Sequence, residues 1–193
     1  IYDYATPFLK RYEPTELHYK QYFQEYKEVY DYYFTYHCRD KEMKMKKALE
    51  EHPNKLQQMQ WVAANIPPFI KDISEKYEQA FPVKFKQDVY IFVGLGGSNA
   101  YTYLSMDPQI GFCVEKLEAE EGALQTIIAH EFGHSLHHQY TTYCGIEASS
   151  ITWNDPYTLL LQEGVATYLS MQVVDVPRDV YFGWTRDVEW LTL

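Results

Sequence analysis

The hydrophobic pattern of the chain changes character at Pro82, and this change constrains the fold more than any other feature. Before Pro82, apolar residues recur every three or four positions, as they do on one face of a helix. The clearest run extends from Thr15 to His37 and contains seven aromatic residues at this spacing: Tyr19, Tyr22, Phe23, Tyr26, Tyr30, Tyr33 and Phe34. After Pro82, residues 83–93 are rich in β-branched and aromatic residues, which is typical of a strand. We therefore expect an α+β fold, with a helical part at residues 1–82.

The helical part is expected to hold three further helices that prolines separate from one another. A charged segment at residues 40–51 predicts the first, and Pro53 should end it, because proline disfavours the helical conformation of the residue before it. Residues 55–65 and 69–81 predict the other two helices, with the Pro67-Pro68 pair between them.

Three short segments after Pro82 predict the strands of a small mixed or antiparallel sheet. The strongest is residues 89–93, the second is residues 110–115, and residues 101–104 predict a third. Residues 94–99 read Gly-Leu-Gly-Gly-Ser-Asn, a composition typical of a flexible turn. The segment lacks the lysine of a phosphate-binding loop, so we expect a hairpin turn or a mobile flap rather than a nucleotide site.

Two strong helix signals follow the strands. The first covers residues 121–138, where apolar residues keep helical spacing: Leu124, Ile127, Ile128, Phe132 and Leu136. Glutamates at its start place negative charge at the positive end of the helix dipole. The second helix should begin with Asp155 as N-cap and Pro156 in its first turn, and run to about Val174. Residues 141–154 would form the loop between the two helices.

One face of the first of these helices carries residues that can bind a metal. His130 and His134 are four positions apart, so their side chains lie one above the other on the same side of a helix. Two imidazole nitrogens placed in this way can bind one Zn²⁺ at about 2.0–2.1 Å. The carboxylate of Glu131 can then take a proton from a water that the metal acidifies. The motif His130-Glu131-Phe132-Gly133-His134 therefore predicts a site for metal-assisted hydrolysis.

A catalytic zinc site also needs a third protein ligand. A third histidine in the extended form of the motif would require glycine at position 137 and histidine at position 140, where the chain has His137 and Tyr140. The other common solution is a glutamate on the next helix, and Glu163 meets it. This residue lies in a leucine-rich run, where a carboxylate is costly unless it is paired or metal-bound. Gly133 and Gly164 lie beside the ligands, although glycine costs a helix about 1 kcal/mol relative to alanine. Close approach of the two helices, which only a residue without a side chain permits, would explain both glycines.

Together the two helices resemble the gluzincins, the thermolysin-like clan of zinc metallopeptidases. The likeness rests on His-Glu-x-x-His at residues 130–134 and on Glu-Gly-x-Ala-x-Tyr at residues 163–168, and it covers about residues 110–174. It implies that residues 83–193 form a zincin-like catalytic part, packed with residues 1–82 as one domain, which hydrolyses peptide bonds. By this likeness, the zinc ligands are His130, His134 and Glu163. The general base that it implies is Glu131.

The resemblance also implies roles for neighbouring residues. Thr167, one turn after the third ligand, corresponds to a polar residue that supports a ligand histidine. Residues 110–115 correspond to the edge strand that holds an extended peptide by strand addition. The chain departs from the clan because none of its seven histidines follows His138, so the downstream histidine that helps to stabilise the oxyanion has no counterpart. Tyr143 and Tyr168 are the candidates to replace it, since a phenol can donate to developing negative charge.

Charge and composition restrict the partners of the chain. Its net charge of −10 argues against nucleic acid, whose phosphates call for clustered lysine and arginine. The one basic stretch, residues 41–47, is interrupted by Glu42 and is typical of a solvated helix face. No apolar stretch is long enough to span a bilayer. We therefore expect a peptide or protein substrate as the partner.

The cysteines and the chain ends do not fix a compartment. Cys38, Cys113 and Cys144 are odd in number and lack CxxC spacing, which argues against a disulfide framework and against a cysteine zinc site. We expect Cys113, on a predicted strand, to act as a small buried hydrophobe. The chain begins at Ile1 rather than at methionine, which leaves room for a removed leader or upstream domain. Residues 188–193 read as an unfinished helix, so we expect the natural protein to continue.

Two rival interpretations stay open at this point. A catalytically decayed zincin fold, acting as an interaction module or as a zinc-stabilised structural module, would account for the absent downstream histidine. The presence of Glu131 opposes it, because a structural zinc site has no use for that carboxylate. A coincidental motif in an all-helical bundle would bind no metal. His137 and His138, which should close the motif helix, are expected to be polar or cationic caps rather than ligands.

Overall fold

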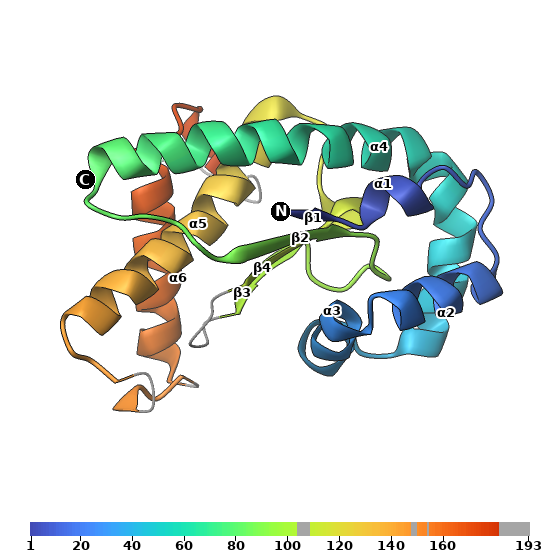
Figure 1. The fold of residues 1–193 in the computed structure, drawn as a ribbon, viewed down its shortest axis with the longest axis horizontal. Helices are drawn as coiled ribbons and strands as arrows, with labels where there is room; N and C mark the ends of the chain where they lie inside the picture. The colour runs from blue at the N-terminus through green and yellow to red at the C-terminus, as the bar shows by residue number, and fades with distance from the viewer. Residues whose placement is uncertain (104–108, 148–149, 154, 182–193) are drawn as a thin grey trace.

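Helices cover both faces of a small mixed sheet in the computed structural model of the chain (Figure 1). The structure describes residues 1–103, 109–147, 150–153 and 155–181. The strands are β1 (Tyr2–Asp3), β2 (Asp88–Phe92), β3 (Ala100–Tyr103) and β4 (Gln109–Cys113). The helices are α1 (Ala5–Phe8), α2 (Glu16–Glu25), α3 (Lys27–Tyr32), the π-helix η1 (Tyr33–His37), α4 (Lys41–Ala80), the 3₁₀-helix η2 (Val114–Lys116), α5 (Glu121–Tyr143), α6 (Pro156–Ser170) and α7 (Arg178–Tyr181). The predicted α+β class is therefore confirmed.

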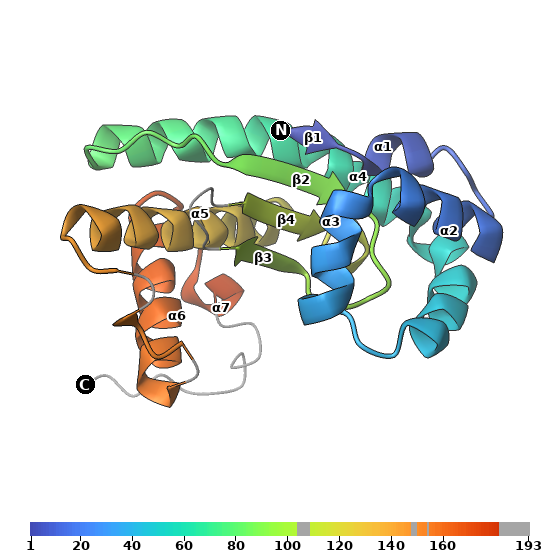
Figure 2. The ribbon, with the colours of Figure 1, turned by 60° about the horizontal axis from the view of Figure 1, so that its bottom comes forward.

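The strands lie in the order β1-β2-β4-β3, as Figure 2 shows. β2 pairs in parallel with β1 on one side and with β4 on the other, while β3 runs antiparallel to β4. The three predicted strands are confirmed as β2, β3 and β4. The prediction that residues 110–115 form the edge strand is wrong, because β4 is paired on both sides and the edge belongs to β3. β1 was not predicted, since two residues carry no periodicity.

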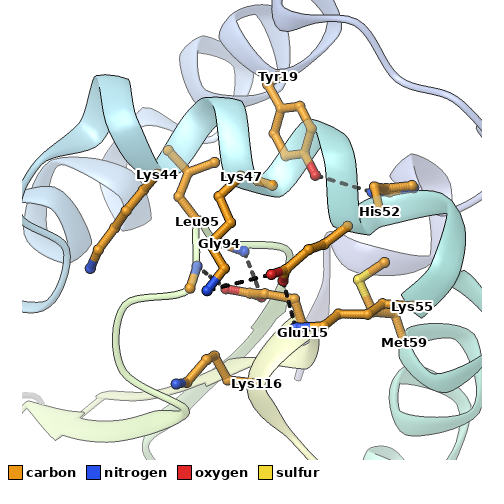
Figure 3. Close-up of a pocket in the computed structure, with 13 residues that line it drawn as sticks. Tyr19, Lys44, Lys47, His52, Lys55, Met59, Gly94, Leu95, Glu115 and Lys116 are labelled. Carbon is orange, nitrogen blue, oxygen red and sulfur yellow. Dashed lines mark hydrogen bonds and ion pairs between the residues drawn. The ribbon is translucent and has the colours of Figure 1, made fainter.

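The glycine-rich segment at residues 94–99 carries the chain across the sheet and is not a hairpin turn. β2 and β3 are not neighbours in the sheet, so the hairpin prediction is wrong. The carboxylate of Glu115 accepts the backbone N–H groups of Gly94 and Gly96, each at 2.9 Å (Figure 3). The hydroxyl of Tyr33 accepts two further N–H groups of the segment, at 3.0 and 2.9 Å. Two buried side chains thus satisfy four amides that a hairpin would have paired across strands.

The three helices predicted between prolines are a single helix, α4, of 40 residues. Pro53, Pro67 and Pro68 all lie inside it, so the predicted breaks are wrong. Its buried residues recur at helical spacing along most of its length: Met45, His52, Met59, Val62, Ala63, Ile66, Ile70, Ile73 and Tyr77. Burial of this stripe outweighs a cost of about 3 kcal/mol for each internal proline. The first turns of α4 stand at a steep angle to the rest (Figure 1), the usual response of a helix to an internal proline.

The aromatic face predicted for residues 15–37 is confirmed, and it packs against the sheet. It is divided among α2, α3 and η1, which share the side of the sheet opposite to α4 (Figure 2). The rings of Tyr30 and Phe92 meet edge to face, with centroids 5.4 Å apart. The Tyr30 hydroxyl donates to the carbonyl oxygen of Val93 at 2.6 Å, and the Val93 N–H donates to the hydroxyl of Tyr22 at 3.1 Å. These tyrosines therefore bind the sheet through their rings and their hydroxyls.

The two helices that carry the motifs are confirmed, with different ends. α5 continues beyond the predicted end to Tyr143, so His137 and His138 lie inside it and the prediction that they cap it is wrong. α6 begins as predicted, because the side chain of Asp155 accepts two N–H groups of its first turn at 3.0 and 3.1 Å. It ends at Ser170 rather than near Val174.

The remaining predictions concern cysteines, membrane segments and the chain end. Cys38 and Cys113 are buried and Cys144 is exposed, and each of the three is a free thiol. The prediction for Cys113 is confirmed, since its exposed fraction is 0%. Within the described ranges, no helix combines the length and the apolar character needed to cross a membrane. The predicted helix at residues 188–193 lies outside the described residues.

Candidate metal centre

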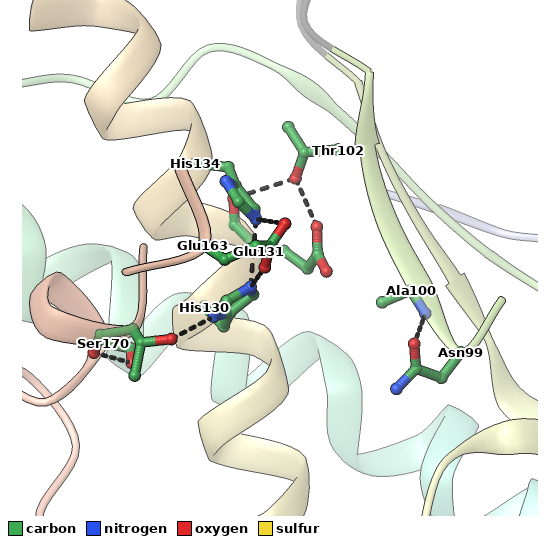
Figure 4. A network of polar contacts seen from close by, with 9 residues as sticks. Asn99, Ala100, Thr102, His130, Glu131, His134, Glu163 and Ser170 are labelled. Carbon is green, nitrogen blue, oxygen red and sulfur yellow. Dashed lines mark hydrogen bonds and ion pairs between the residues drawn. The ribbon is translucent and has the colours of Figure 1, made fainter. Parts of the chain in front are cut away.

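Three side chains from α5 and α6 converge on one point (Figure 4). The Nε2 atoms of His130 and His134 lie 3.1 Å apart. Glu163 places its Oε2 atom 3.0 Å from Nε2 of His130 and its Oε1 atom 3.6 Å from Nε2 of His134. Each of the three residues thus offers a ligand atom, and these atoms all lie within 4.8 Å of one another.

The separations within this cluster fit a tetrahedral zinc ion. With bonds of about 2.0–2.1 Å, tetrahedral angles place neighbouring ligand atoms about 3.3 Å apart. The observed separations of 3.0, 3.1 and 3.6 Å lie on both sides of that value. Two imidazoles and one carboxylate are ligands that zinc accepts, and three protein ligands leave a fourth position open. The residues present therefore fit the metal in both geometry and donor chemistry.

Close contact between α5 and α6 brings the ligands together. A Cβ added at Gly133 would lie 2.8 Å from the carbonyl oxygen of Ala166, a residue with an exposed fraction of 0%. The prediction that Gly133 permits a close helix approach is confirmed. The same prediction for Gly164 is wrong, because nothing lies within 4 Å of the position that its Cβ would take. The two helices therefore touch at Gly133 and Ala166, while Gly164 faces away.

Glu163 reaches the histidines from a more exposed position than its neighbours in sequence suggest. Its side chain is 62% exposed, and the leucines at residues 159–161 are largely exposed as well. The prediction that burial makes a partner necessary for this carboxylate is therefore wrong, although Glu163 does contact His130 and His134. Hydrogen bonds with His130 and His134 hold the pKa of Glu163 well below its usual range. The carboxylate is thus ionised, as metal ligation requires.

Glu131 lies beside the cluster in a very different environment. Its exposed fraction is only 5%. The hydroxyl of Thr102, on β3, donates to its carboxylate Oε2 at 2.6 Å and also lies 3.1 Å from its backbone oxygen (Figure 4). Burial raises the pKa of Glu131, against the opposing influence of His134, His130 and the Thr102 hydroxyl. A carboxylate with a raised pKa is suited to accept a proton at neutral pH.

Each ligand histidine has a contact that bears on its protonation or orientation. The hydroxyl of Thr167 lies 3.4 Å from Nδ1 of His130, the ring nitrogen that faces away from the cluster. Burial of His134 disfavours its charged form, but the hydrogen bond with Glu163 and the nearby carboxylate charges raise its pKa overall. Metal ligation requires a neutral imidazole, so a proton and a metal ion compete for this ring.

The two tyrosines considered as oxyanion donors lie away from the cluster. Tyr143 is the last residue of α5 and is 88% exposed. Tyr168 is 63% exposed and lines a shallow apolar hollow on α6 together with Tyr157 and Leu160. Neither tyrosine lines the cavity that contains Glu131. The structure therefore does not bring these two residues to the candidate metal centre.

The cluster opens into a cavity of about 360 Å³ between α5, α6 and the edge strand β3. Its wall contains residues that sequence reasoning did not single out, among them His37, Asn99 and Thr102. The side-chain oxygen of Asn99 accepts the N–H of Ala100 at 2.8 Å, which leaves its amide nitrogen to donate toward the cavity (Figure 4). A second hollow, of about 310 Å³, shares His130 and Asn99 with the first. No spacing in the sequence links these residues to the motif, because the fold alone brings them together.

Comparison with family models, with curated proteins and with solved structures finds no match to this chain. The candidate site is therefore interpreted through its own geometry and chemistry.

Proposed function

We propose that the chain is a zinc-dependent metallopeptidase of the gluzincin type, with a zincin-like fold. One observation carries the proposal: ligand atoms of His130, His134 and Glu163 lie within 4.8 Å of one another, and the buried carboxylate of Glu131 adjoins them. The chemistry that zinc supplies at such a site is polarisation of a peptide carbonyl and acidification of water. The motifs at residues 130–134 and 163–168 support the same assignment, since the gluzincins carry them on two successive helices.

Glu131 is the proposed general base. The Thr102 hydroxyl occupies its Oε2 atom, while Oε1 has no hydrogen-bond partner among the described residues. Oε1 is therefore the atom that accepts a proton from the attacking water and returns it to the leaving amine. The contact with Thr102 fixes the rotation of the carboxylate, so that Oε1 stays presented to the cavity.

The edge strand β3 is the proposed binding surface for the peptide substrate. Among the described residues, β3 pairs with β4 on one side only, so its other edge can accept an extended peptide by strand addition. Asn99 stands at the start of this strand with its amide nitrogen turned to the cavity. That amide is placed to donate to a carbonyl of the bound peptide or to developing negative charge, the task for which no downstream histidine is present.

The test of the function is the substitution Glu131→Gln. We expect protein purified without added metal to carry about one zinc per chain by elemental analysis and to cleave a mixed peptide pool, read by mass spectrometry. Glu131→Gln should retain the zinc and lose turnover by roughly 10²–10⁴-fold. Glu75→Gln, at an exposed position on α4, is the matched control and should keep both. Full activity in Glu131→Gln would exclude the proposed base.

A zinc-stabilised module without catalysis is the second candidate, and one observation favours it. Tyr143 and Tyr168 do not line the cavity, so the two donors considered from the sequence are absent from it. This rival predicts bound zinc, closed coordination and no turnover of any peptide by the unaltered chain. Replacement of zinc by cobalt separates the two functions, because an absorption spectrum that responds to added inhibitory anions indicates an open coordination position.

A further inference from the structure

One side of α6 carries a stripe of apolar side chains that lie at the surface. Its members recur every three or four residues, as they do on one side of a helix. They are Tyr157, Leu160, Leu161, Val165 and Tyr168 on α6, and Met171 at its C-cap. Tyr157 is 81% exposed and Leu160 is 70% exposed. Contiguous apolar side chains at a surface mark a face that another molecule covers.

This α6 stripe lies on the side of the helix that faces away from the metal centre. Ala166, on the opposite side, packs against Gly133 of α5, and Glu163 is turned to the two histidines. No member of the stripe lines the cavity that contains Glu131. Figures 1 and 2 show α6 at the end of the molecule that is remote from α2. The stripe therefore has no task in the proposed hydrolysis.

Gly164 lies in the middle of the stripe without a neighbour of its own. It is exposed, and a Cβ at this position would meet no atom within 4 Å. Glycine weakens the interior of a helix, so its presence there is explained where another backbone approaches closely. Gly133 has such a neighbour within the described chain, the carbonyl group of Ala166. A second helix that crosses α6 at Gly164 would supply the corresponding neighbour.

The apolar positions are symmetric about Gly164. Leu160 stands four positions before it and Tyr168 four positions after it, while Tyr157 and Met171 stand seven positions before and after it. When a helix packs antiparallel against its own copy, positions equally far before and after the residue on the two-fold axis meet each other. With Gly164 on the axis, every one of these meetings is apolar. A second copy of the chain thus fits the stripe, whereas an unrelated partner would require no such symmetry.

The distribution of charge also favours a second copy at this face. The chain has a net charge of −10, so two copies repel each other over most of their surface. Glu163 is the one charged residue between Pro156 and Ser170, and it is turned to the histidines of α5. Two copies can therefore meet along the stripe without opposing like charges. A strongly charged partner would find no complementary group there.

The stripe is large enough for a modest interface. A standard interface covers about 800 Å² on each partner, and a buried aromatic side chain contributes about 150–250 Å². At their exposed fractions, Tyr157 and Tyr168 supply roughly a third of the standard area, and the aliphatic members of the stripe and Met171 add to it. An interface of this size is typical of reversible association.

We propose that two copies of the chain associate through the α6 stripe, as an antiparallel pair of α6 helices with Gly164 on the two-fold axis. The backbones approach where the two glycines meet, and the apolar side chains on both sides of them interdigitate. No metal ligand belongs to the stripe, so each protomer keeps its own candidate metal centre. The stripe is no part of the hydrophobic core. Dilution below the dissociation constant therefore leaves a folded protomer, and a substitution at Gly164 acts on association alone.

Sedimentation equilibrium of the unaltered chain between about 1 and 100 μM measures the association, and we expect a monomer–dimer equilibrium in this range. Leu160→Glu buries an unpaired carboxylate in each copy and should weaken the dimer by roughly a hundredfold. Leu17→Glu changes a leucine of α2 that is similarly exposed and should leave the association unchanged. Circular dichroism and zinc content should be the same in both variants. A chain that stays monomeric at every concentration would overturn the proposal and assign the stripe to another partner, and equal weakening in the two variants would place the contact elsewhere.

Disulfide cross-linking tests the pairing of the helices, in a background where serine replaces the exposed Cys144. Leu160 faces the partner's Tyr168, whereas it is displaced from the partner's Leu160 by eight residues, about 12 Å along the helix axis. A disulfide needs Cα atoms about 4.4–6.8 Å apart. An oxidised mixture of Leu160→Cys and Tyr168→Cys chains should therefore form linked dimers, and either variant alone should not. Cross-linking of Leu160→Cys alone that equals or exceeds that of the mixture would exclude the antiparallel pair.

Discussion

The carbonyl oxygen of Ala166 lies 2.8 Å from the point where a β-carbon at Gly133 would stand. One hydrogen atom in place of a methyl group thus sets the distance between α5 and α6. His130 and His134 belong to one of these helices and Glu163 to the other, so that distance also sets the geometry of the candidate metal centre. The packing of the two helices and the placement of the ligands therefore depend on the same contact. Substitutions at Gly133 and at Gly164 can test this dependence.

Gly133→Ala should destabilise the fold and weaken metal binding. The added methyl group would overlap the Ala166 carbonyl, and such overpacking costs about 1–3 kcal/mol. Gly164→Ala is the control, since it adds the same group to α6 where nothing lies within 4 Å. That change should leave stability equal or raise it by up to about 1 kcal/mol, because alanine is the better helix former. Urea unfolding and zinc content measure both effects, and equal stability losses in the two variants would contradict the packing argument.

Thr102→Val should reduce peptide hydrolysis about tenfold while zinc stays bound. Valine keeps the shape of the side chain but leaves Oε2 of the buried Glu131 without its donor at 2.6 Å, so the carboxylate is no longer held in one orientation. Thr102→Ser retains the hydroxyl and should recover most of the activity. Thr6→Val, at an exposed position of α1, controls for the loss of a hydroxyl as such. Activity of Thr102→Val equal to that of the unaltered chain would remove Thr102 from the mechanism.

Zinc should stabilise the native chain, because a ligand that binds only the folded state shifts unfolding by mass action. At a free concentration 100 times its dissociation constant, the shift is about 2.7 kcal/mol. Chelation should therefore lower the unfolding temperature, and added zinc should restore it. Glu163→Ala should lose most of this response, since it removes one of three ligands, whereas Glu75→Ala on α4 should keep it. A response to zinc that survives in Glu163→Ala would place the metal elsewhere.

Stability should fall below about pH 6.5 in part through His52. Burial lowers the pKa of this imidazole from its ordinary value of 6.5, outweighing the opposite influence of the Arg11 carbonyl. A folded-state pKa below the unfolded one means that the stability contribution is present above about pH 6.5. It is lost as the pH falls through the folded-state pKa, because the proton displaces the hydrogen bond from Tyr19.

The substitution His52→Gln isolates this effect. Glutamine cannot titrate, so the slope of unfolding free energy against pH between pH 5 and pH 7 should be flatter in this variant. Chemical unfolding measured at several pH values decides between the two outcomes, and an unchanged slope in His52→Gln would mean that other groups cause the acid sensitivity.

Local signals in the sequence were sufficient for the parts of the fold whose causes are local. Asp155 and Pro156 mark a helix start because an N-cap acts on the next two or three residues. The pair His130 and His134 follows from the helical repeat alone. The helix break predicted at Pro53 is wrong because the rule that proline ends a helix considers only neighbouring residues. The buried stripe of α4, which packs against the rest of the fold, outweighs this local preference.

The rest of the candidate site depends on contacts between distant segments. His37, Asn99 and Thr102 meet the motif helix only after the sheet has formed, and no periodicity relates their positions to residues 130–134. The exposure of Glu163 was misjudged because an apolar run in a helix does not reveal whether another element covers it. Strand order is equally non-local: three strands were predicted from composition, but which of them is the edge is settled by pairing across the chain.

The pairing of Tyr2 with Tyr90 has a consequence for how the chain acquires its shape during synthesis. Among the described strands, β1 pairs with β2 alone, so Tyr2 and Asp3 cannot join the sheet until the whole of α4 and then β2 have been synthesised. Pairing β1 with β2 closes a long loop, and the conformational entropy is lost before the contacts between the strands stabilise the chain. Folding is therefore slow. In the interval, the helices that precede β2 expose tyrosine and phenylalanine rings to solvent. A nascent chain halted before residue 88 should therefore bind chaperones more strongly than one halted at a point beyond residue 181.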